Sequence, residues 1–224
     1  MSEKKELQKD RLKKLITNDN INLAMELLSE EDKLQLIRAD ANFLFAFKNP
    51  SSQIIEEAVL YKIDMIFNID PKYLTNSLLM IAIKQDMKKY GTQCSLSWSI
   101  THALEKYQPS QDVQDYLIEY NLDRMSYSDF GKSYWSEESL IKIVSKKPKC
   151  FEYIKNKTPE VMKMAVQKDY NNLEKISPQT VDLCLFILER NPKALPLITI
   201  VPNKDVKSTI NLLKKKQEVI KALG

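Results

Sequence analysis

The sequence predicts an all-α protein, built as an irregular, solenoid-like array of short helix pairs. Apolar residues recur at spacings of three and four along nearly the whole chain, which is the period of an amphipathic helix. Residues that cap helices stand directly before prolines at short intervals, which indicates many short helices. A stretch of the N-terminal half also matches a stretch of the C-terminal half without a gap, which indicates repetition.

Proline positions mark where individual helices begin. Five of the nine prolines follow a capping residue, namely Asn49, Asp70, Thr158, Ser177 and Asn191. The capping side chain accepts a bond from a free backbone N–H, and proline at the first helical position gives up no bond. With the apolar stripes, these signals predict helices at 3–17, 21–28, 30–38, 40–47, 51–62, 64–68, 71–89, 95–106, 110–121, 136–146, 148–155, 159–169, 171–176, 178–190, 192–199 and 203–222. The β-branched run 195–201, which contains Pro196, is where a strand or irregular segment could interrupt them.

The internal match pairs residues 39–83 with 146–190 at a shift of 107 positions. Seven residues are identical, and they are Lys48/Lys155, Asn49/Asn156, Ala58/Ala165, Val59/Val166, Ile69/Ile176, Pro71/Pro178 and Leu78/Leu185. Apolar residues also match apolar residues elsewhere in the segment, as in Ile54/Val161 and Leu74/Val181. The match predicts a helix start at both Pro71 and Pro178. Predicted starts at 136, 158, 177 and 202 lie about twenty residues apart, a spacing that favours stacked helix pairs over the alternative of a compact irregular bundle.

The segment 147–176 reads KPKCFEYIKNKTPEVMKMAVQKDYNNLEKI, and 189–198 reads ERNPKALPLI. These strings resemble the degenerate helical repeats of unknown function found in phage, giant-virus and intracellular-bacterial proteins, whose pattern runs NPxALxYIxNxTPExxxxAV. The resemblance is clearest over 147–198. It implies an all-helical repeat without known catalytic residues, and it suggests a phage or viral accessory protein that works in the host cytoplasm.

Composition excludes several classes of function. The chain has 224 residues, of which only 3 are glycine, so it lacks the glycine-rich phosphate loop, the dinucleotide-binding fingerprint and the nucleophile elbow. One histidine and three scattered cysteines exclude most zinc sites and a disulfide framework, and we predict no cofactor and no metal.

Three features predict a cytoplasmic protein without membrane contact. No apolar run has the roughly 18 to 20 residues of a membrane span. The charged segment 1–14 is unlike a signal peptide. The unpaired Cys94, Cys150 and Cys184 suit a reducing compartment.

The match divides the chain into N-terminal repeats (1–86), a non-repeating insertion (87–135) and C-terminal repeats (136–224), which we expect to form one continuous domain. The insertion holds both tryptophans and most of the tyrosines. Insertions between repeats often carry binding residues. The candidate partner-binding residues are Trp98, Tyr127, Phe130, Tyr134 and Trp135. A core position is the favoured alternative for Trp98, and both a buried and a partly exposed position stay open for Trp135.

The C-terminal segment 203–224 carries six lysines against Asp205 and Glu218. Lys214, Lys215 and Lys216 form its densest part and are a candidate basic patch for nucleic acid or an acidic partner. A solvated helix face is the simpler interpretation. Arginine, which reads base edges and phosphates best, occurs only four times, so the composition does not favour specific DNA binding.

Catalysis would have to rely on residues of the insertion. A Cys94–His102 pair lacks an identified third group. The carboxylates Asp112, Asp115 and Glu119 have a spacing that is typical of a solvated helix face. We therefore predict a non-enzymatic protein-binding module. The alternatives are a nucleic-acid-associated protein that uses the lysine-rich helix, and a structural subunit of a viral assembly. The oligomeric state stays open.

Overall fold

The computed structural model describes residues 25, 27–91, 96–199 and 206–223. All regular secondary structure within these ranges is helical, which confirms the predicted all-α class. The predicted helix 3–17, most of 21–28 and the predicted start at Pro202 lie outside the described residues. None of the described helices combines the length and the apolar character that crossing a bilayer requires.

The chain divides into two compact units, Met1–Pro109 and Ser110–Gly224. The first unit contains α3 (Glu30–Ala39), η1 (Ala41–Ala46), α4 (Ser52–Tyr61), α5 (Met65–Asn68), η2 (Pro71–Tyr73), α6 (Asn76–Tyr90) and α7 (Trp98–Tyr107), where η marks a 3-10 helix. The second unit contains α8 (Gln111–Tyr120), η3 (Tyr127–Gly131), α9 (Glu137–Lys146), η4 (Pro148–Tyr153), α10 (Pro159–Lys168), η5 (Tyr170–Lys175), α11 (Val181–Arg190), η6 (Pro192–Leu197) and α12 (Val206–Leu223). The predicted insertion 87–135 therefore contributes helices to both units.

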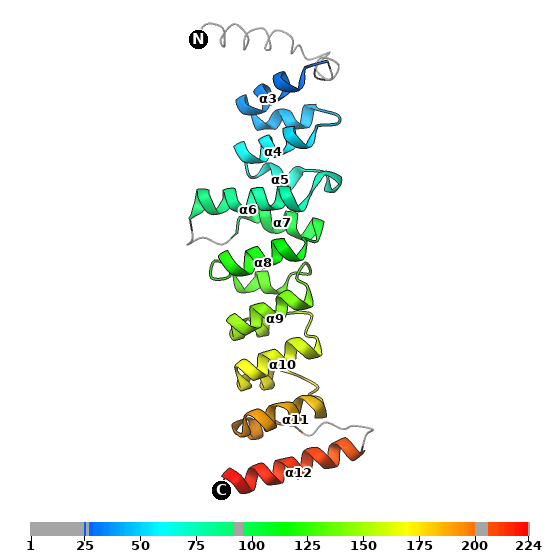
Figure 1. Cartoon of the computed structure of the whole chain (residues 1–224), viewed down its shortest axis with the longest axis vertical. Helices are drawn as coiled ribbons and strands as arrows, with labels where there is room; N and C mark the ends of the chain where they lie inside the picture. The colour runs from blue at the N-terminus through cyan, green and yellow to red at the C-terminus, as the bar shows by residue number, and fades with distance from the viewer. Residues whose placement is uncertain (1–24, 26, 92–95, 200–205, 224) are drawn as a thin grey trace. The chain divides into compact units, whose positions relative to one another are not determined.

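The repeating element is a ten-residue α-helix followed by a six-residue 3-10 helix, as in α9–η4, α10–η5 and α11–η6. The caps Ser136, Thr158 and Thr180 follow one another at intervals of 22 residues, and each side chain accepts the N–H three positions on. The caps Ser29 and Ser51 of the first unit keep the same interval. In Figure 1, α9, α10 and α11 stack in sequence order, and neighbours pack on each other. The predicted array of short helix pairs is thus present.

Each repeat buries a pair of adjacent apolar residues in the second half of its α-helix. These pairs are Leu36–Ile37, Ala58–Val59, Ile143–Val144, Ala165–Val166 and Ile187–Leu188, and all of them are at most 5% exposed. A single ten-residue helix cannot shield such a pair from water by itself, so the neighbouring repeat must cover it. The stack of repeats is therefore also the core.

The duplication holds at the level of whole elements. A shift of 107 residues places α3, η1 and α4 on α9, η4 and α10 with the same first and last positions. The helix starts predicted at Pro71 and Pro178 are wrong, however. Pro71 begins only the short η2, while α6 and α11 begin after Thr75 and Thr180, whose side chains cap them.

The register is lost because the linkers before α6 and α11 differ in length. From Ile69 to Thr75 the chain is two residues longer than from Ile176 to Thr180. As a consequence Leu78 is buried in α6, whereas its predicted counterpart in α11 is only half-buried. The run 195–199 begins within η6 and holds no strand, and residues 200–201 lie outside the described part.

Candidate functional site

The structure separates the five aromatic residues that were predicted to bind a partner. Trp98 is 67% exposed and Tyr127 is 44% exposed, while Phe130, Tyr134 and Trp135 are at most 6% exposed. The prediction of a contact surface is therefore wrong for Phe130, Tyr134 and Trp135, which belong to the core of the second unit. The favoured alternative of a core position for Trp98 is also wrong.

Helix geometry explains the burial of Trp135. It stands directly before the cap Ser136, and Leu140, which is also buried, is the fourth residue of α9. Apolar residues at these two positions commonly fold back on each other at a helix entry. The indole Nε1 donates a hydrogen bond of 2.9 Å to the carbonyl oxygen of Asp129, which satisfies the polar atom inside the core.

Trp98 does not belong to the buried apolar stripe of its helix, α7. It is the first residue of α7, in which Ile100, Ala103 and Leu104 are buried. Its indole ring lies against two others, with centroid distances of 4.4 Å to Phe67 and 5.5 Å to His102. The rings of Phe67 and His102 are themselves 4.6 Å apart. The exposed tryptophan is thus supported by a compact aromatic cluster.

Polar bonds on both sides of this cluster fix α5 against α7. Lys106 Nζ donates a 3.3 Å hydrogen bond to the carbonyl oxygen of Phe67 and lies 5.5 Å from the centre of its ring. Ser99 Oγ donates a 3.0 Å hydrogen bond to Asp64 Oδ1. These bonds hold the helices that carry Phe67 and Trp98 against each other.

The repeat extends this cluster to a residue that the sequence reasoning did not single out. Phe45 stands 22 residues before Phe67, so the two occupy equivalent positions in consecutive repeats and share a face of the array. Phe45 is 57% exposed. We call Phe45, Phe67, Trp98 and His102 the aromatic face.

The duplicated copy shows that exposed rings are not a requirement of the repeat. At a shift of 107 residues, Phe45 matches Glu152 and Phe67 matches Glu174. Glu152 is exposed and pairs with Lys175 at 2.9 Å. The second unit therefore presents carboxylates to solvent where the first presents phenyl rings. The pairings of Phe45 with Glu152 and of Phe67 with Glu174 are the sequence signal that points to this part of the aromatic face.

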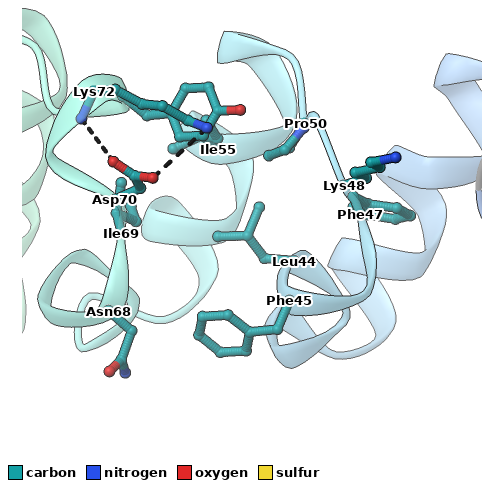
Figure 2. A pocket seen from close by; sticks show the side chains of 11 residues that line it. Leu44, Phe45, Phe47, Lys48, Pro50, Ile55, Asn68, Ile69, Asp70 and Lys72 are labelled. Atoms are coloured by element: carbon teal, nitrogen blue, oxygen red, sulfur yellow. Dashed lines mark hydrogen bonds and ion pairs between the residues drawn. The ribbon is translucent and has the colours of Figure 1, made fainter. Parts of the chain in front are cut away.

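A pocket of about 220 Å³ opens next to Phe45. Its apolar lining includes Leu44, Phe45, Ile55 and Ile69. Figure 2 shows the Phe45 ring and the Asn68 amide on one side of the pocket, and Lys72 next to Asp70 on the other. A second pocket of about 260 Å³ shares Pro50, Ile55, Lys72 and Tyr73 with the first. The first unit thus has a hollow surface that continues the aromatic face.

The longer linker accounts for this hollow. Asp70 accepts a 3.0 Å bond from the backbone N–H of Lys72 and pairs with its Nζ at 3.6 Å, which holds the extra turn η2. The corresponding linker of the second unit instead carries Gln179, which is 3% exposed. Its Nε2 donates to the carbonyl oxygens of Leu173 (3.1 Å) and Leu197 (2.9 Å). The buried amide of Gln179 therefore closes the linker of the second unit, whereas the corresponding linker of the first unit is open.

The predicted basic patch lies on the last helix. In α12, Leu212 and Val219 are buried, whereas Lys214 is exposed and Lys215 and Lys216 are half-buried. Lys215 is 3.5 Å from Glu218. These lysines lie outside the buried stripe of Leu212 and Val219, as expected for a solvated helix face.

The carboxylates considered for catalysis have structural or solvent-facing positions. Asp115 accepts bonds from Lys142 (2.8 Å) and Gln111 (2.7 Å), and these bonds lower the pKa of its carboxyl group. Asp112 and Glu119 are exposed on α8 of the second unit. His102 belongs to the first unit, and Cys94 lies outside the described residues.

Within residues 25, 27–91, 96–199 and 206–223, no three histidine, cysteine or acidic side chains gather closely enough to hold an ion.

The aromatic face and its pocket are therefore the strongest candidate site. Comparison of the chain with models of protein families, with curated proteins and with solved structures returns no significant match.

Proposed function

We propose that the chain is a non-enzymatic protein-binding module and that the aromatic face is its contact surface. The observation that carries this proposal is Trp98, which leaves 67% of its surface in solvent while Phe67 and His102 support its ring. Tryptophan is among the residues most enriched at the energetic centres of protein interfaces. A rigid, exposed tryptophan is suited to such a contact.

The chemistry of the face supports binding over catalysis. The ring of His102, the single histidine, packs against Phe67 at 4.6 Å and Trp98 at 5.5 Å. A general base needs a proton donor or acceptor within hydrogen-bond reach, whereas stacked rings supply contact area. The resemblance over 147–198 is in keeping with a phage or viral accessory protein that binds a host or assembly component in the cytoplasm.

Affinity capture tests the proposal. The tagged full-length chain, its Trp98→Ala variant and its Tyr120→Ala variant are each used to capture proteins from the cells in which the chain is produced. Tyr120 is a matched control because it is 53% exposed and lies in the second unit. We expect one protein at fixed stoichiometry with the parent chain and with Tyr120→Ala, and its loss with Trp98→Ala.

Two other results would argue against the proposal. Retention of the same protein by Trp98→Ala would remove the aromatic face from the interface. Recovery of nucleic acid alone, released by salt and abolished when Lys214, Lys215 and Lys216 are replaced by glutamate, would favour the nucleic-acid alternative. Circular dichroism melts check that all variants are folded, since truncation of exposed rings should cost less than about 1 kcal/mol.

A further inference from the structure

We propose that the occupant of the aromatic face is an acidic segment of the partner, which inserts one apolar side chain into the pocket beside Phe45. This inference rests on the proposed function, because it specifies the chemistry of the partner at the same surface. It is argued from the charge around the face, from the lining of the pocket and from the contrast between the two copies.

Three lysines supply positive charge around the face. Lys48, Lys62 and Lys106 are exposed, and none of the three pairs with a carboxylate of the described ranges. Lys48 lines the pocket, Lys106 lies over a ring of the face, and Lys62 donates to the amide oxygen of Asn42 at 3.1 Å. A partner with acidic residues would complement these cations and would associate faster because of them.

Two carboxylates beside the face, Asp64 and Asp70, take part in bonds within the chain. Asp70 pairs with Lys72, and Asp64 accepts the hydroxyl of Ser99. A basic partner would have to compete with these bonds and would also meet the three lysines that pair with no carboxylate. The charge pattern therefore favours an acidic occupant over a basic one.

The pocket has the lining of an anchor site for one apolar side chain. The exposed Phe45 ring forms an apolar wall over the nearly buried Leu44, Ile55 and Ile69, and about 220 Å³ of space is open beside it. Interfaces gain most of their energy from a few apolar anchors seated in such pockets and surrounded by polar contacts. An aliphatic or aromatic side chain of the partner would fill this space and displace its water.

Single-stranded nucleic acid also combines aromatic rings with negative charge, so it is the alternative occupant of the aromatic face. It would stack bases on Trp98, but its sugars and phosphates would place no apolar side chain in the pocket beside Phe45. The observed combination of pocket and lysines thus favours a peptide, and nucleic acid becomes an outcome of the test.

Selection from a peptide library tests the inference on the full-length chain. A phage-displayed library of random peptides of about 12 residues, the usual length of linear recognition motifs, is panned against it. We expect selected sequences with aspartate and glutamate around one aromatic or aliphatic residue. Panning against a Lys48→Glu, Lys62→Glu and Lys106→Glu variant should shift the selection to lysine and arginine.

The matched control reverses three lysines of the second unit, Lys149→Glu, Lys155→Glu and Lys168→Glu. These lysines are also exposed, and Lys155 is the duplicated counterpart of Lys48. This variant should select the same acidic peptides as the parent chain. A change common to both triple variants would reflect net charge and would contradict a local role for the aromatic face.

The affinity of one selected, fluorescein-labelled peptide for each variant then separates the effect of the pocket beside Phe45 from the effect of the three lysines. We expect Phe45→Ala and the triple reversal at the face each to weaken binding at least about tenfold, and the control triple variant to bind within about twofold of the parent. Three results would each overturn the inference. They are selected peptides without an acidic bias, a selection that yields no peptide, and oligothymidine that competes for the chain as well as the unlabelled peptide does.

The natural partner distinguishes this inference from the proposed function. If Trp98→Ala loses the captured protein while the triple reversal at the face retains it, the face is the contact surface but its partner is not acidic. If both variants retain the protein, the proposed function at this face fails as well.

Discussion

The place of an aromatic residue relative to a helix cap decides whether its ring faces core or solvent in this protein. Trp135 precedes the cap Ser136 and turns back onto the first turn of α9, where it is 6% exposed. Trp98 follows the cap Ser97 and stands outside the buried stripe of α7, where it is 67% exposed. Both tryptophans have serines beside them, so composition alone does not separate these two environments.

Thiol reactivity provides a prediction at the residue scale. Cys150 and Cys184 are fully buried, and loss of hydration raises the pKa of each thiol to about 11. The thiolate is the reactive form, so both thiols should resist alkylation in the folded chain. In a Cys94→Ser variant, iodoacetamide at about pH 8 should label neither cysteine natively and both in urea, as read by mass spectrometry. Rapid native labelling of either residue would contradict its buried position.

The same two thiols make the stability of the folded chain decrease at alkaline pH. Their pKa values rise from an ordinary value of 9.0 to about 11 in the folded chain, so the unfolded chain releases these protons at lower pH. Their contribution to the free energy of unfolding is therefore complete below about pH 9 and is lost as the pH rises towards 11. Urea midpoints should fall less steeply over this range in a Cys184→Ala variant than in the parent chain.

At the scale of elements, stability depends on the contact of each α-helix with the next repeat. Ala58 and Ala165 are fully buried at equivalent positions of α4 and α10. Because the alanine methyl group is fully buried at both positions, no room is left for a larger side chain. A carboxylate at either position would lose its hydration without gaining a partner.

Placing aspartate at either position tests this packing. We expect Ala58→Asp and Ala165→Asp each to destabilise the chain by more than about 4 kcal/mol, because a buried, unpaired charge is among the most damaging substitutions. The exposed Ala222→Asp in α12 is the control and should melt like the parent chain in circular dichroism. Melting of both buried variants at the parent temperature would mean that α4 and α10 do not pack as described.

The elements also show what could be predicted from the sequence. Apolar phase and capping residues predicted α3, α4, α9 and α10 closely, because both signals are local. The segments 40–47 and 148–155 were predicted as helices but form the 3-10 helices η1 and η4. The pocket was not predicted, because it depends on how a linker two residues longer packs against the neighbouring repeat. The pairing of Phe45 with Glu152 was visible in the sequence, but its meaning depends on the exposure of both side chains.

At the scale of the whole molecule, each of the two units has its own stack of helices and its own core. In the first unit, α4 packs on α3 and α6, and α7 packs on α5 and α6. In the second unit, α8 to α12 form successive contacts. Because repeats are stabilised mainly by their nearest neighbours, a stack of several repeats can fold without the remainder of the chain. The binding surface proposed here lies entirely in the first unit.

Separate production of 1–109 and 110–224 tests whether folding and binding divide in the same way. We expect each fragment to unfold cooperatively in urea, and their far-ultraviolet circular dichroism spectra to sum to that of the whole chain. Fragment 1–109 should bind the selected acidic peptide within about threefold of the full chain, and 110–224 should not bind it, because it lacks Phe45, Trp98 and the pocket. Binding by 110–224 would place the contact surface in the second unit. A folded 1–109 that fails to bind would mean that the surface requires residues from both units.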